Sequence, residues 1–355
     1  MDIARKLFQN MTYDALIVLS PSNTFYLSGY ESSNCQIVIT KTNQYFVTDM
    51  RYFNEASLVL GGRFVVVASN GEGEKQLFDI AQKDGCIAKI GWDDNISYNE
   101  FLAVYDTAKK FADIKEFSPI AKQISAARNI KNAEEIAKIR KAQAITEIAF
   151  DEILKFIKEG QSEIEIAAML EYIMLKNGGE LAFDSIVACG KNGSSPHAHR
   201  SEKKLVSGEF ITMDFGAKYQ GYCSDMTRTV ACGQLSDKQI DIYNTVLLAQ
   251  QTALDIIKAG MVGKDCHQIA NKVIQDKGYG EYFLHSLGHG VGVDIHEGVG
   301  MTPKTADKLE CNMIVSVEPG IYIEGFCGVR IEDIVVVHDT CVEDLTQSNK
   351  KLIIL

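Results

Sequence analysis

The sequence predicts two domains, an α/β domain followed by an α+β domain that contains two similar halves. The chain has 355 residues, which is more than a single hydrophobic core usually supports. β-type and helical runs alternate up to about residue 123. Beyond that point, a pair of helical segments recurs 100 residues further along the chain, and β-type runs follow each pair.

The first domain is expected over residues 1–123. Its strands are predicted from short apolar or β-branched runs at 15–20, 35–40, 44–48, 63–68 and 88–92. Its helices are predicted from apolar residues at helical spacing over 51–60, 74–83 and 98–110. A short linker is expected over residues 124–132.

The second domain is expected over residues 133–355 and begins with the helical stretches 133–160 and 162–179. The stretches 242–260 and 264–280 repeat this plan in gapless register. The matching pairs are Leu154 and Leu254, Ile157 and Ile257, Lys158 and Lys258, Gly160 and Gly260, Gly178 and Gly278, and Phe183 and Phe283. Chance similarity of two helix pairs is the alternative, but the gapless register favours a duplication. Two copies are too few for a solenoid, so we expect a pseudo-twofold domain whose halves face each other across a cleft.

The composition excludes several classes of protein. The apolar fraction of 46% and the charged fraction of 23% are ordinary for a globular chain. A net charge of −11 argues against a nucleic-acid surface, and no apolar run is long enough to span a bilayer. The N-terminus lacks the apolar region of a secretory signal, and the nine cysteines show no CxxC pair. We therefore expect a cytoplasmic protein that binds neither nucleic acid nor membrane.

Four carboxylates interrupt the β-type runs of the second domain, at Asp214, Asp225, Glu318 and Glu332. A single carboxylate in such a run is more often a turn cap, an ion pair or an edge residue. Here the four accompany a histidine cluster, His285, His289 and His296. Several carboxylates with an imidazole suit Mn²⁺ or another divalent first-row ion better than a thiolate zinc site does.

These motifs resemble the pita-bread metallopeptidases, in particular the branch of the Xaa-Pro aminopeptidases (aminopeptidase P) and prolidases. The resemblance covers essentially the whole chain. TDMRY (48–52) is similar to the creatinase/prolidase N-terminal domain, and RNIKNAEEIAKIRKA (128–142) to the family's entry into its catalytic domain. The motifs MDFGA, SDMTRT, LGHGVG, VEPGIY and RIED match the family's metal-binding motifs in order. The resemblance implies a pita-bread domain with duplicated helix pairs around a curved antiparallel sheet.

The resemblance also implies a dinuclear metal site. Asp214 would chelate one ion, His289 and Glu318 the other, and Asp225 and Glu332 would bridge the two. The ions implied are most often Mn²⁺, with Co²⁺ or Zn²⁺ as alternatives. The residues that match the family's remaining active-site positions are His197, His285, His296 and Arg330, and Glu318 would also relay a proton.

The implied activity is that of an Xaa-Pro aminopeptidase, which hydrolyses the bond between an N-terminal residue and a following proline. We expect a homodimer. A prolidase acting on Xaa-Pro dipeptides is the nearest alternative. His296 and Glu297 are followed by GVGMTP, without the arginine that prolidases often have there, and this favours the aminopeptidase.

More remote alternatives are a metal-free creatinase-like hydrolase, a non-catalytic peptide-binding module and a methionine aminopeptidase. The intact ligand set argues against the first two, and the N-terminal domain argues against the third. Two further expectations concern single residues. Tyr282, Phe283 and Tyr322 are candidates for an apolar wall against the proline ring, and His267 and His338 are expected on the surface or on a helix.

Overall fold

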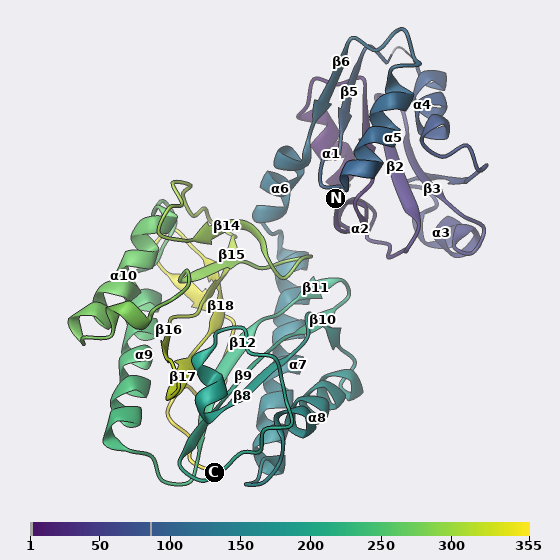
Figure 1. The fold of residues 1–355 in the computed structure, drawn as a ribbon. Coiled ribbons are helices and arrows are strands. Elements are labelled where there is room, and N and C mark those ends of the chain that lie inside the picture. Colours follow the sequence, from purple (N-terminus) through teal and green to yellow (C-terminus); the bar gives the residue numbers. More distant parts are fainter. Residues whose placement is uncertain (1–2, 86) are drawn as a thin grey trace. The chain divides into compact units, whose positions relative to one another are not determined.

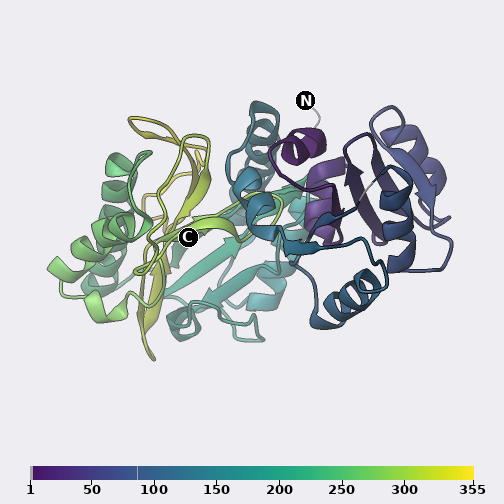
Figure 2. The ribbon, with the colours of Figure 1, turned by 90° about the horizontal axis from the view of Figure 1, so that it is seen from above.

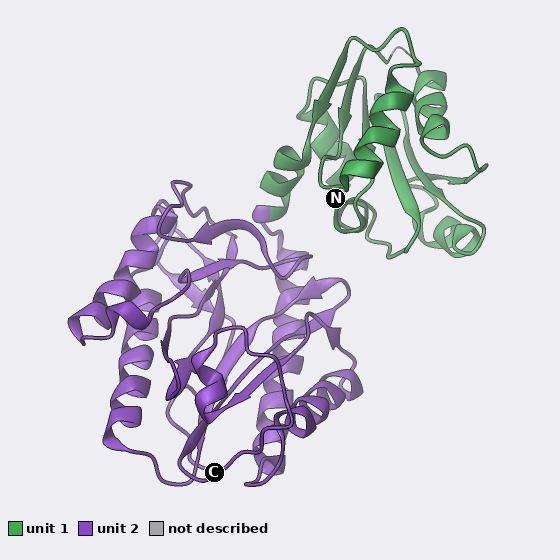
Figure 3. Ribbon diagram, in the orientation of Figure 1, with its two compact units in different colours: residues 1–128 green, residues 129–355 purple. Residues whose placement is uncertain are grey.

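The computed structural model describes residues 3–85 and 87–355, and the chain divides into two compact units, residues 1–128 and 129–355 (Figure 3). The stretch expected as a linker, 124–132, is partly helical, because α6 (Ala121–Asn129) extends into it. The domain boundaries at residues 123 and 133 that the sequence indicates stay a prediction.

Unit 1 contains a six-stranded mixed sheet in its described part, with the order β4-β3-β2-β1-β5-β6 (Figure 1). The strands are β1 (Ala15–Val18), β2 (Cys35–Thr40), β3 (Gln44–Thr48), β4 (Val65–Ala68), β5 (Lys89–Trp92) and β6 (Glu116–Pro119). The helices are α1 (Ile3–Gln9), α2 (Pro21–Ser28), α3 (Phe53–Leu60), α4 (Glu74–Lys83), α5 (Tyr98–Ala108) and α6. Ala15 and Ile17 on β1 share a core with Leu77 and Phe78 on α4 and with Val104 on α5, so α4 and α5 cover one face of the sheet.

The predicted strands and helices of unit 1 are all present, whereas α1, α2, β6 and α6 were not predicted. β1 pairs antiparallel with β2 and parallel with β5, which places residues that are far apart in the sequence side by side. The sheet brings 15–18 and 89–92 together through such pairing, which the local pattern of apolar residues does not encode.

Unit 2 is built from two helix pairs and the strands between them (Figures 1 and 2). The helices are α7 (Ala133–Phe156), α8 (Glu163–Lys176), α9 (Asp237–Ile256) and α10 (Gly263–Asp276), with the short 3-10 turns η1 (Gly190–Ser194) and η2 (Gly280–Tyr282). The strands of the first half are β7 (Glu180–Leu181), β8 (Ile186–Cys189), β9 (Glu209–Phe215), β10 (Ala217–Tyr219), β11 (Tyr222–Cys223) and β12 (Met226–Cys232). Those of the second half are β13 (Gly288–Gly290), β14 (Glu297–Met301), β15 (Ile314–Val317), β16 (Gly320–Ile323), β17 (Cys327–Arg330), β18 (Asp333–Val337) and β19 (Val342–Asp344).

Each helix pair covers the main sheet of its own half. The first sheet has the order β12-β9-β8, and the second has the order β14-β13-β15-β18-β19, so β9 and β15 occupy equivalent places. One core joins α7 and α8 to β8, β9 and β12, and another joins α9 and α10 to β15, β17 and β18. In Figure 2 the green helices α9 and α10 lie beside the yellow strands of the second half.

The backbone confirms the predicted duplication. Gly160 and Gly260 have φ values of 88° and 86°, and Gly178 and Gly278 have values of 83° and 84°. These positive values favour glycine, which has no Cβ to clash with the preceding carbonyl. The N–H of Gly160 donates to the carbonyl of Leu205 at 2.8 Å, and the N–H of Gly260 donates to that of Leu309 at the same distance.

His267 meets one of the two alternatives that the sequence predicts for it, a helix, and not the other. It lies on a helix, α10, but it is buried with only 5% of its surface exposed, so it is not a surface residue. Its ring stacks on Phe283, with centroids 5.1 Å apart. His338 directly follows β18 and is half-buried. Within residues 3–85 and 87–355, no helix has both the length and the apolar composition that a membrane crossing requires.

Candidate active site

The candidate ligands come from equivalent places in the two halves of unit 2. Asp214 lies near the end of β9, and Glu318 directly follows β15, 104 residues later. Asp225 directly precedes β12, and Glu332 directly precedes β18. The carboxylates other than Asp214 therefore lie at breaks between strands, where the backbone can turn side chains of both halves toward one point.

The strand geometry of β9 agrees with the alternation that the sequence predicts. Met213 and Phe215 are fully buried in the core against α7 and α8. Asp214 projects from the opposite face, together with Thr212, since successive side chains of a strand point to opposite faces. This face of β9 lines a cavity of about 250 Å³.

The structure brings all nine predicted site residues to this cavity. The residues that line it are Phe183, Ile186, Pro196, His197, Asp214, Asp225, His285, Ser286, His289, Ile295, His296, Glu318, Arg330 and Glu332. The apolar wall consists of Phe183, Ile186, Pro196 and Ile295. Tyr282, Phe283 and Tyr322 do not line the cavity, so the prediction that they form this wall was wrong. Tyr322 instead supports two residues of the site from behind.

Four of the candidate ligands converge closely. Asp225, His289 and Glu332 offer ligand atoms that all lie within 4.8 Å of one another. Nε2 of His289 is 3.3 Å from Oε1 of Glu318 and 3.5 Å from Oδ2 of Asp225. Oδ1 of Asp225 and Oδ1 of Asp214 are buried and have no hydrogen-bond partner.

The orientation of His289 indicates what these atoms face. Nδ1 is 3.2 Å from the carbonyl of Gly290, and this contact requires the proton to be on Nδ1. Burial lowers the pKa of His289, so the ring is neutral and Nε2 presents a lone pair to the carboxylates. A lone pair facing ionised carboxylates is unfavourable unless a proton or a metal cation lies between them. The donor set of oxygens and one imidazole therefore fits divalent cations.

The carboxylates affect one another strongly. Burial raises the pKa of Glu318 to about 8. Burial and the nearby carboxylates also raise the pKa values of Asp225 and Glu332. Such mutual repulsion is typical of a site that binds positive charge.

Arg330 holds the cavity wall together. Its guanidinium donates to Oδ2 of Asp214 at 2.5 Å, to the hydroxyl of Tyr322 at 2.8 Å and to the carbonyl of Pro196 at 3.2 Å. The Tyr322 hydroxyl lies 2.9 Å from Nε2 of His285. Nδ1 of His285 donates to the carbonyl of Ser286 at 2.8 Å, so both nitrogens of His285 have partners.

Two hydroxyl residues that the sequence analysis missed orient the ligands. Thr227 donates to Oε2 of Glu332 at 2.7 Å and accepts from Nε of Arg330 at 2.9 Å. Ser316 donates to Oε1 of Glu318 at 3.0 Å and accepts from the N–H of His289. Thr227 follows the ligand Asp225 by two residues, and Ser316 precedes Glu318 by two. A search at a period of two around each ligand would have found both residues.

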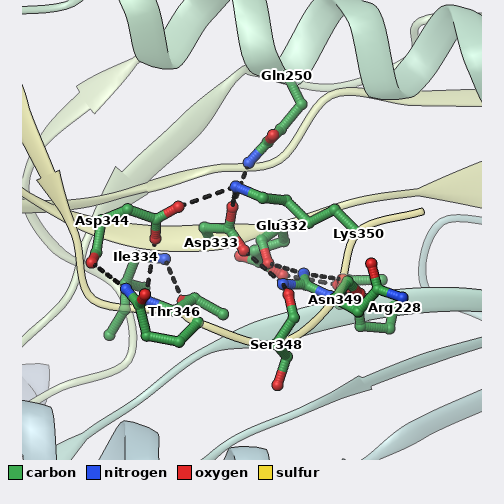
Figure 4. A network of polar contacts seen from close by, with 12 residues as sticks. Arg228, Gln250, Glu332, Asp333, Ile334, Asp344, Thr346, Ser348, Asn349 and Lys350 are labelled. Carbon is green, nitrogen blue, oxygen red and sulfur yellow. Dashed lines mark hydrogen bonds and ion pairs between the residues drawn. The ribbon is translucent and has the colours of Figure 1, made fainter.

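A cluster of charged residues around Arg228, Asp333 and Lys350 adjoins Glu332 (Figure 4). The five N–H groups of Arg228 donate to the carbonyls of Thr227, Glu332, Ser348 and Asn349 and to Oδ1 of Asp333. Arg228 thus connects the segments that carry Asp225 and Glu332 to the C-terminal residues.

Asp333 is the centre of this cluster. Its Oδ2 accepts from Gln250 and from Lys350, and Lys350 also donates to Asp344 at 2.9 Å. Although burial opposes ionisation, Arg228 and Lys350 lower the pKa of Asp333.

A mixed α/β unit, followed by a duplicated unit whose halves bring together carboxylates and imidazoles, defines a metal-dependent hydrolase. The chain belongs to the family described as Metallopeptidase family M24, which matches residues 137–339. Residues 1–130 match the Creatinase/Prolidase N-terminal domain. The predicted fold class and the predicted family are therefore confirmed, and the chain is a metallopeptidase that uses divalent metal ions.

Individual relatives cover the whole chain. An uncharacterized peptidase of Bacillus subtilis is 39% identical over 99% of this chain and 98% of its own length. The solved structure of an Xaa-Pro dipeptidase from Bacillus anthracis has a TM-score of 0.92 at 39% identity, covering 99% of this chain and 98% of that one. The structure of an X-Pro aminopeptidase from Thermotoga maritima has a TM-score of 0.91 at 36% identity, covering 99% of this chain and 100% of that one.

Proposed function

We propose that the protein is an Xaa-Pro aminopeptidase, which removes the N-terminal residue that precedes a proline. The observation that carries this proposal is the cavity itself, whose lining combines apolar side chains with the cluster of carboxylates and histidines. An Xaa-Pro peptide bond has no N–H, so the site that holds it needs an apolar surface for the ring rather than a hydrogen-bond acceptor. Relatives with similar structures carry Xaa-Pro peptidase names.

The metal ligands are proposed to be Asp214, Asp225, His289, Glu318 and Glu332, and the ions to be two Mn²⁺. Co²⁺ and Zn²⁺ are the alternatives. Asp214 would hold one ion, His289 and Glu318 the other, and Asp225 and Glu332 both. When bound, such ions polarise a substrate carbonyl and lower the pKa of water.

The remaining residues act on the substrate and on protons. Glu318 would accept a proton from the attacking water and pass it to the leaving nitrogen of proline, which becomes a secondary amine. No protein group in the described ranges bonds to the ring nitrogens of His197 or His296, so both rings can hold the substrate carbonyl oxygen. Burial, and to a lesser degree Arg330, lower the pKa of His285 to about 3, so this ring stays neutral and fixes Tyr322. Arg330 orients Asp214 and the carbonyl of Pro196.

A prolidase restricted to Xaa-Pro dipeptides is the second candidate, because a relative of similar identity is named an Xaa-Pro dipeptidase. A dipeptide presents a free carboxylate next to the proline ring. Among the described residues that line the cavity, Arg330 is the one Lys or Arg, and Asp214, Tyr322 and Pro196 already engage it. The cavity lining therefore supplies no spare Lys or Arg side chain for that carboxylate, which favours longer peptides.

The test is an assay of the metal-loaded protein on Ala-Pro, Ala-Pro-Ala and Ala-Ala-Ala. We expect Ala-Pro-Ala to be cleaved best, and at least about tenfold better in kcat/KM than Ala-Ala-Ala, which corresponds to about 1.4 kcal/mol of transition-state binding. Faster cleavage of Ala-Pro than of Ala-Pro-Ala would favour the prolidase. Equal and efficient cleavage of Ala-Pro-Ala and Ala-Ala-Ala would show that the site does not select proline, and would refute both candidates.

We further propose that the protein is a homodimer. Unit 1 exposes large apolar side chains on and near α3, with 86% of Leu58, 55% of Val59 and 66% of Met50 exposed. Such a group of side chains is costly in water unless a partner covers it. Light scattering should give twice the mass of the chain, and Leu58→Asp should shift it toward the monomer, whereas Leu248→Asp on α9 should not.

The cytoplasm is the proposed compartment. The cysteines in the described ranges are unpaired, and most of them are buried. Free thiols persist in a reducing compartment. Cell fractionation with an antibody to the chain would test this assignment.

A further inference from the structure

His197 and Pro196 reach the cavity from a loop, residues 190–200, that joins β8 to the segment leading into β9. This loop contains η1 but no strand, so strand pairing does not fix the position of His197. A side chain that holds a substrate oxygen must nevertheless stay within a fraction of an ångström of one place.

Glu163 holds both ends of this loop. It is the first residue of α8, and it is fully buried. Its Oε1 accepts from the N–H of Cys189 at 2.7 Å and from Nδ2 of Asn192 at 3.0 Å. Its Oε2 accepts from the N–H of Ser201 at 2.9 Å and from the Ser201 hydroxyl at 2.7 Å.

The second half of unit 2 shows that the helix start does not need this carboxylate. The equivalent residue at the start of α10 is Gly263. Its N–H donates to the carbonyl of Asp307 at 3.0 Å, just as the N–H of Glu163 donates to that of Lys203 at 3.1 Å. The backbone contacts alone therefore build the junction in both halves.

The space beside Gly263 also differs from the space beside Glu163. A Cβ at Gly263 would lie 2.5 Å from the carbonyl oxygen of Gly300, so the backbone at Gly300 packs directly against Gly263. In the first half, the carboxylate of Glu163 lies between the start of α8 and the segments that carry Cys189 and Ser201. A buried carboxylate is expensive to desolvate. The buried carboxylate is present at this position in the first half and absent from the second, which indicates that it has a function specific to the first half.

We propose that Glu163 is a positioning residue that fixes His197 and Pro196 at the cavity by holding Cys189, Asn192 and Ser201, a set that we call the Glu163 clasp. The inference rests on the proposed function in one respect, because it takes His197 to contact the substrate. Arg330 holds the same loop from the cavity side, through its hydrogen bond to the carbonyl of Pro196.

The test compares Glu163→Gln with Glu165→Gln in the metal-loaded full chain. Glutamine keeps the size of Glu163 but presents an N–H₂ group to N–H donors, so one end of the loop loses its acceptor. Glu165 is exposed and bonds to the N–H and hydroxyl of Ser162. It is a matched control, because Gln239 makes the same contacts to Ser236 at the start of α9.

We expect Glu163→Gln to lower kcat/KM on Ala-Pro-Ala at least tenfold with unchanged metal content, and Glu165→Gln to leave it unchanged. In a His197→Ala background, Glu163→Gln should cost less than twofold more, since its effect passes through that histidine. Wild-type kcat/KM in Glu163→Gln, or a fully additive loss in the double variant, would overturn the proposal.

Two further measurements keep the proposal testable in every case. Amide hydrogen exchange of residues 190–200 in the metal-free protein should be faster in Glu163→Gln than in wild type, and unchanged exchange would contradict the clasp. This readout is independent of the substrate, so an inactive wild type would refute the proposed function but not the clasp. If Glu163→Gln does not fold, Ser201→Ala removes the hydroxyl that donates to Oε2 of Glu163 and that accepts from Asn192 and Lys203, and it keeps the N–H contact of Ser201 to Glu163. It should lower kcat/KM about threefold, and an unchanged value would overturn the proposal.

Discussion

At the scale of single residues, Asp225 combines the features on which the proposed metal site depends. Its carboxylate is buried, Oδ2 faces His289 at 3.5 Å, and Oδ1 has no protein partner. A buried oxygen without a protein partner and a second oxygen beside an imidazole suit a carboxylate that two cations would share.

Asp225→Asn should abolish most metal binding and turnover. Asparagine keeps the shape of the side chain but removes the charge and replaces one ligand oxygen with an N–H₂ group. Elemental analysis and turnover measured on the same preparation check this. The matched control is His338→Ala, which lies outside the cavity and should keep both values. Similar metal content in the two variants would contradict the ligand assignment.

His267 shows how a residue can be misjudged from its sequence neighbourhood. Its helix carries many polar residues, but its ring is buried against Phe283, and the Phe283 ring meets that of His285 edge-on at 5.3 Å. Burial also lowers the pKa of His267, so it is packed as a neutral ring.

His267→Ala should therefore destabilise the protein, whereas the same substitution at an exposed helix position would have little effect. Removing a buried ring leaves a cavity, and we expect a loss of about 2 kcal/mol in the free energy of unfolding. Denaturant unfolding checks this, with His338→Ala expected within about 0.5 kcal/mol of wild type. Equal stability of the two variants would mean that the packing around Phe283 relaxes fully.

At the scale of elements, the sequence predicts the long repeating segments well and the short ones poorly. The four helices of unit 2 have enough turns for their spacing to be recognised, and the five ligand motifs are unambiguous in order. β8, β13 and β19 contain four, three and three residues. Alternation cannot be read over so few residues, and pairing with β9, β15 and β18 decides their structure.

Local sequence patterns do not predict the walls of the cavity either. Phe183, Pro196 and Ile295 come from loops that no local pattern directs toward the ligands. Asn312 is a further example, because it has a φ of 66° where Gly208, 104 residues earlier, has a φ of 87°. The offset between these two residues is 104 rather than 100, so their equivalence is visible in the structure and not in the register of the repeated helices.

Arg228 connects three segments of the chain, those of Thr227, of Glu332 and Asp333, and of Ser348 and Asn349, so its replacement tests their dependence on one another. Arg228→Met keeps the bulk but leaves Asp333 buried with Lys350 as its remaining cation. We expect a loss of about 3–5 kcal/mol in the free energy of unfolding, with weaker metal binding, because the segments of Asp225 and Glu332 lose their common donor. Chemical unfolding and metal titration measure both effects.

The control for Arg228 is Arg140→Met. Arg140 on α7 pairs with Glu343 at 2.8 Å, and both side chains are about half exposed. An exposed ion pair contributes about 1 kcal/mol or less. A similar loss in both variants would show that the buried cluster contributes no more than a surface pair does.

At the scale of the whole molecule, each unit has its own hydrophobic core, and the candidate ligands all belong to unit 2. The free-energy cost of burying these carboxylates therefore affects the stability of unit 2 alone. In the metal-free protein, burial raises the pKa of Glu318 from 4.5 to about 8, and burial with neighbouring carboxylates raises those of Asp225 and Glu332.

These carboxylates predict that stability depends more strongly on pH in the metal-free protein than in the metal-loaded protein. Between about pH 7 and pH 8, the folded metal-free protein binds more protons than the unfolded chain does, because the pKa of Glu318 is raised to about 8. Its free energy of unfolding must then fall as the pH rises through this window. At lower pH the histidines of unit 2, whose pKa values are lowered by burial, oppose this effect, because the unfolded chain protonates them first. Bound cations compensate the carboxylates and stabilise the folded state by mass action, so the metal-loaded protein should lose much less. Calorimetry of chelator-treated and metal-loaded protein at several pH values measures this difference, which we expect to be on the order of a few kcal/mol.

Hydrogen exchange should place the metal-dependent protection in residues 129–355 and leave 1–128 unchanged. Glu318→Gln, which removes one of the titrating groups, should flatten the pH dependence of the metal-free protein, and an unchanged slope would show that the carboxylates of the site do not cause it.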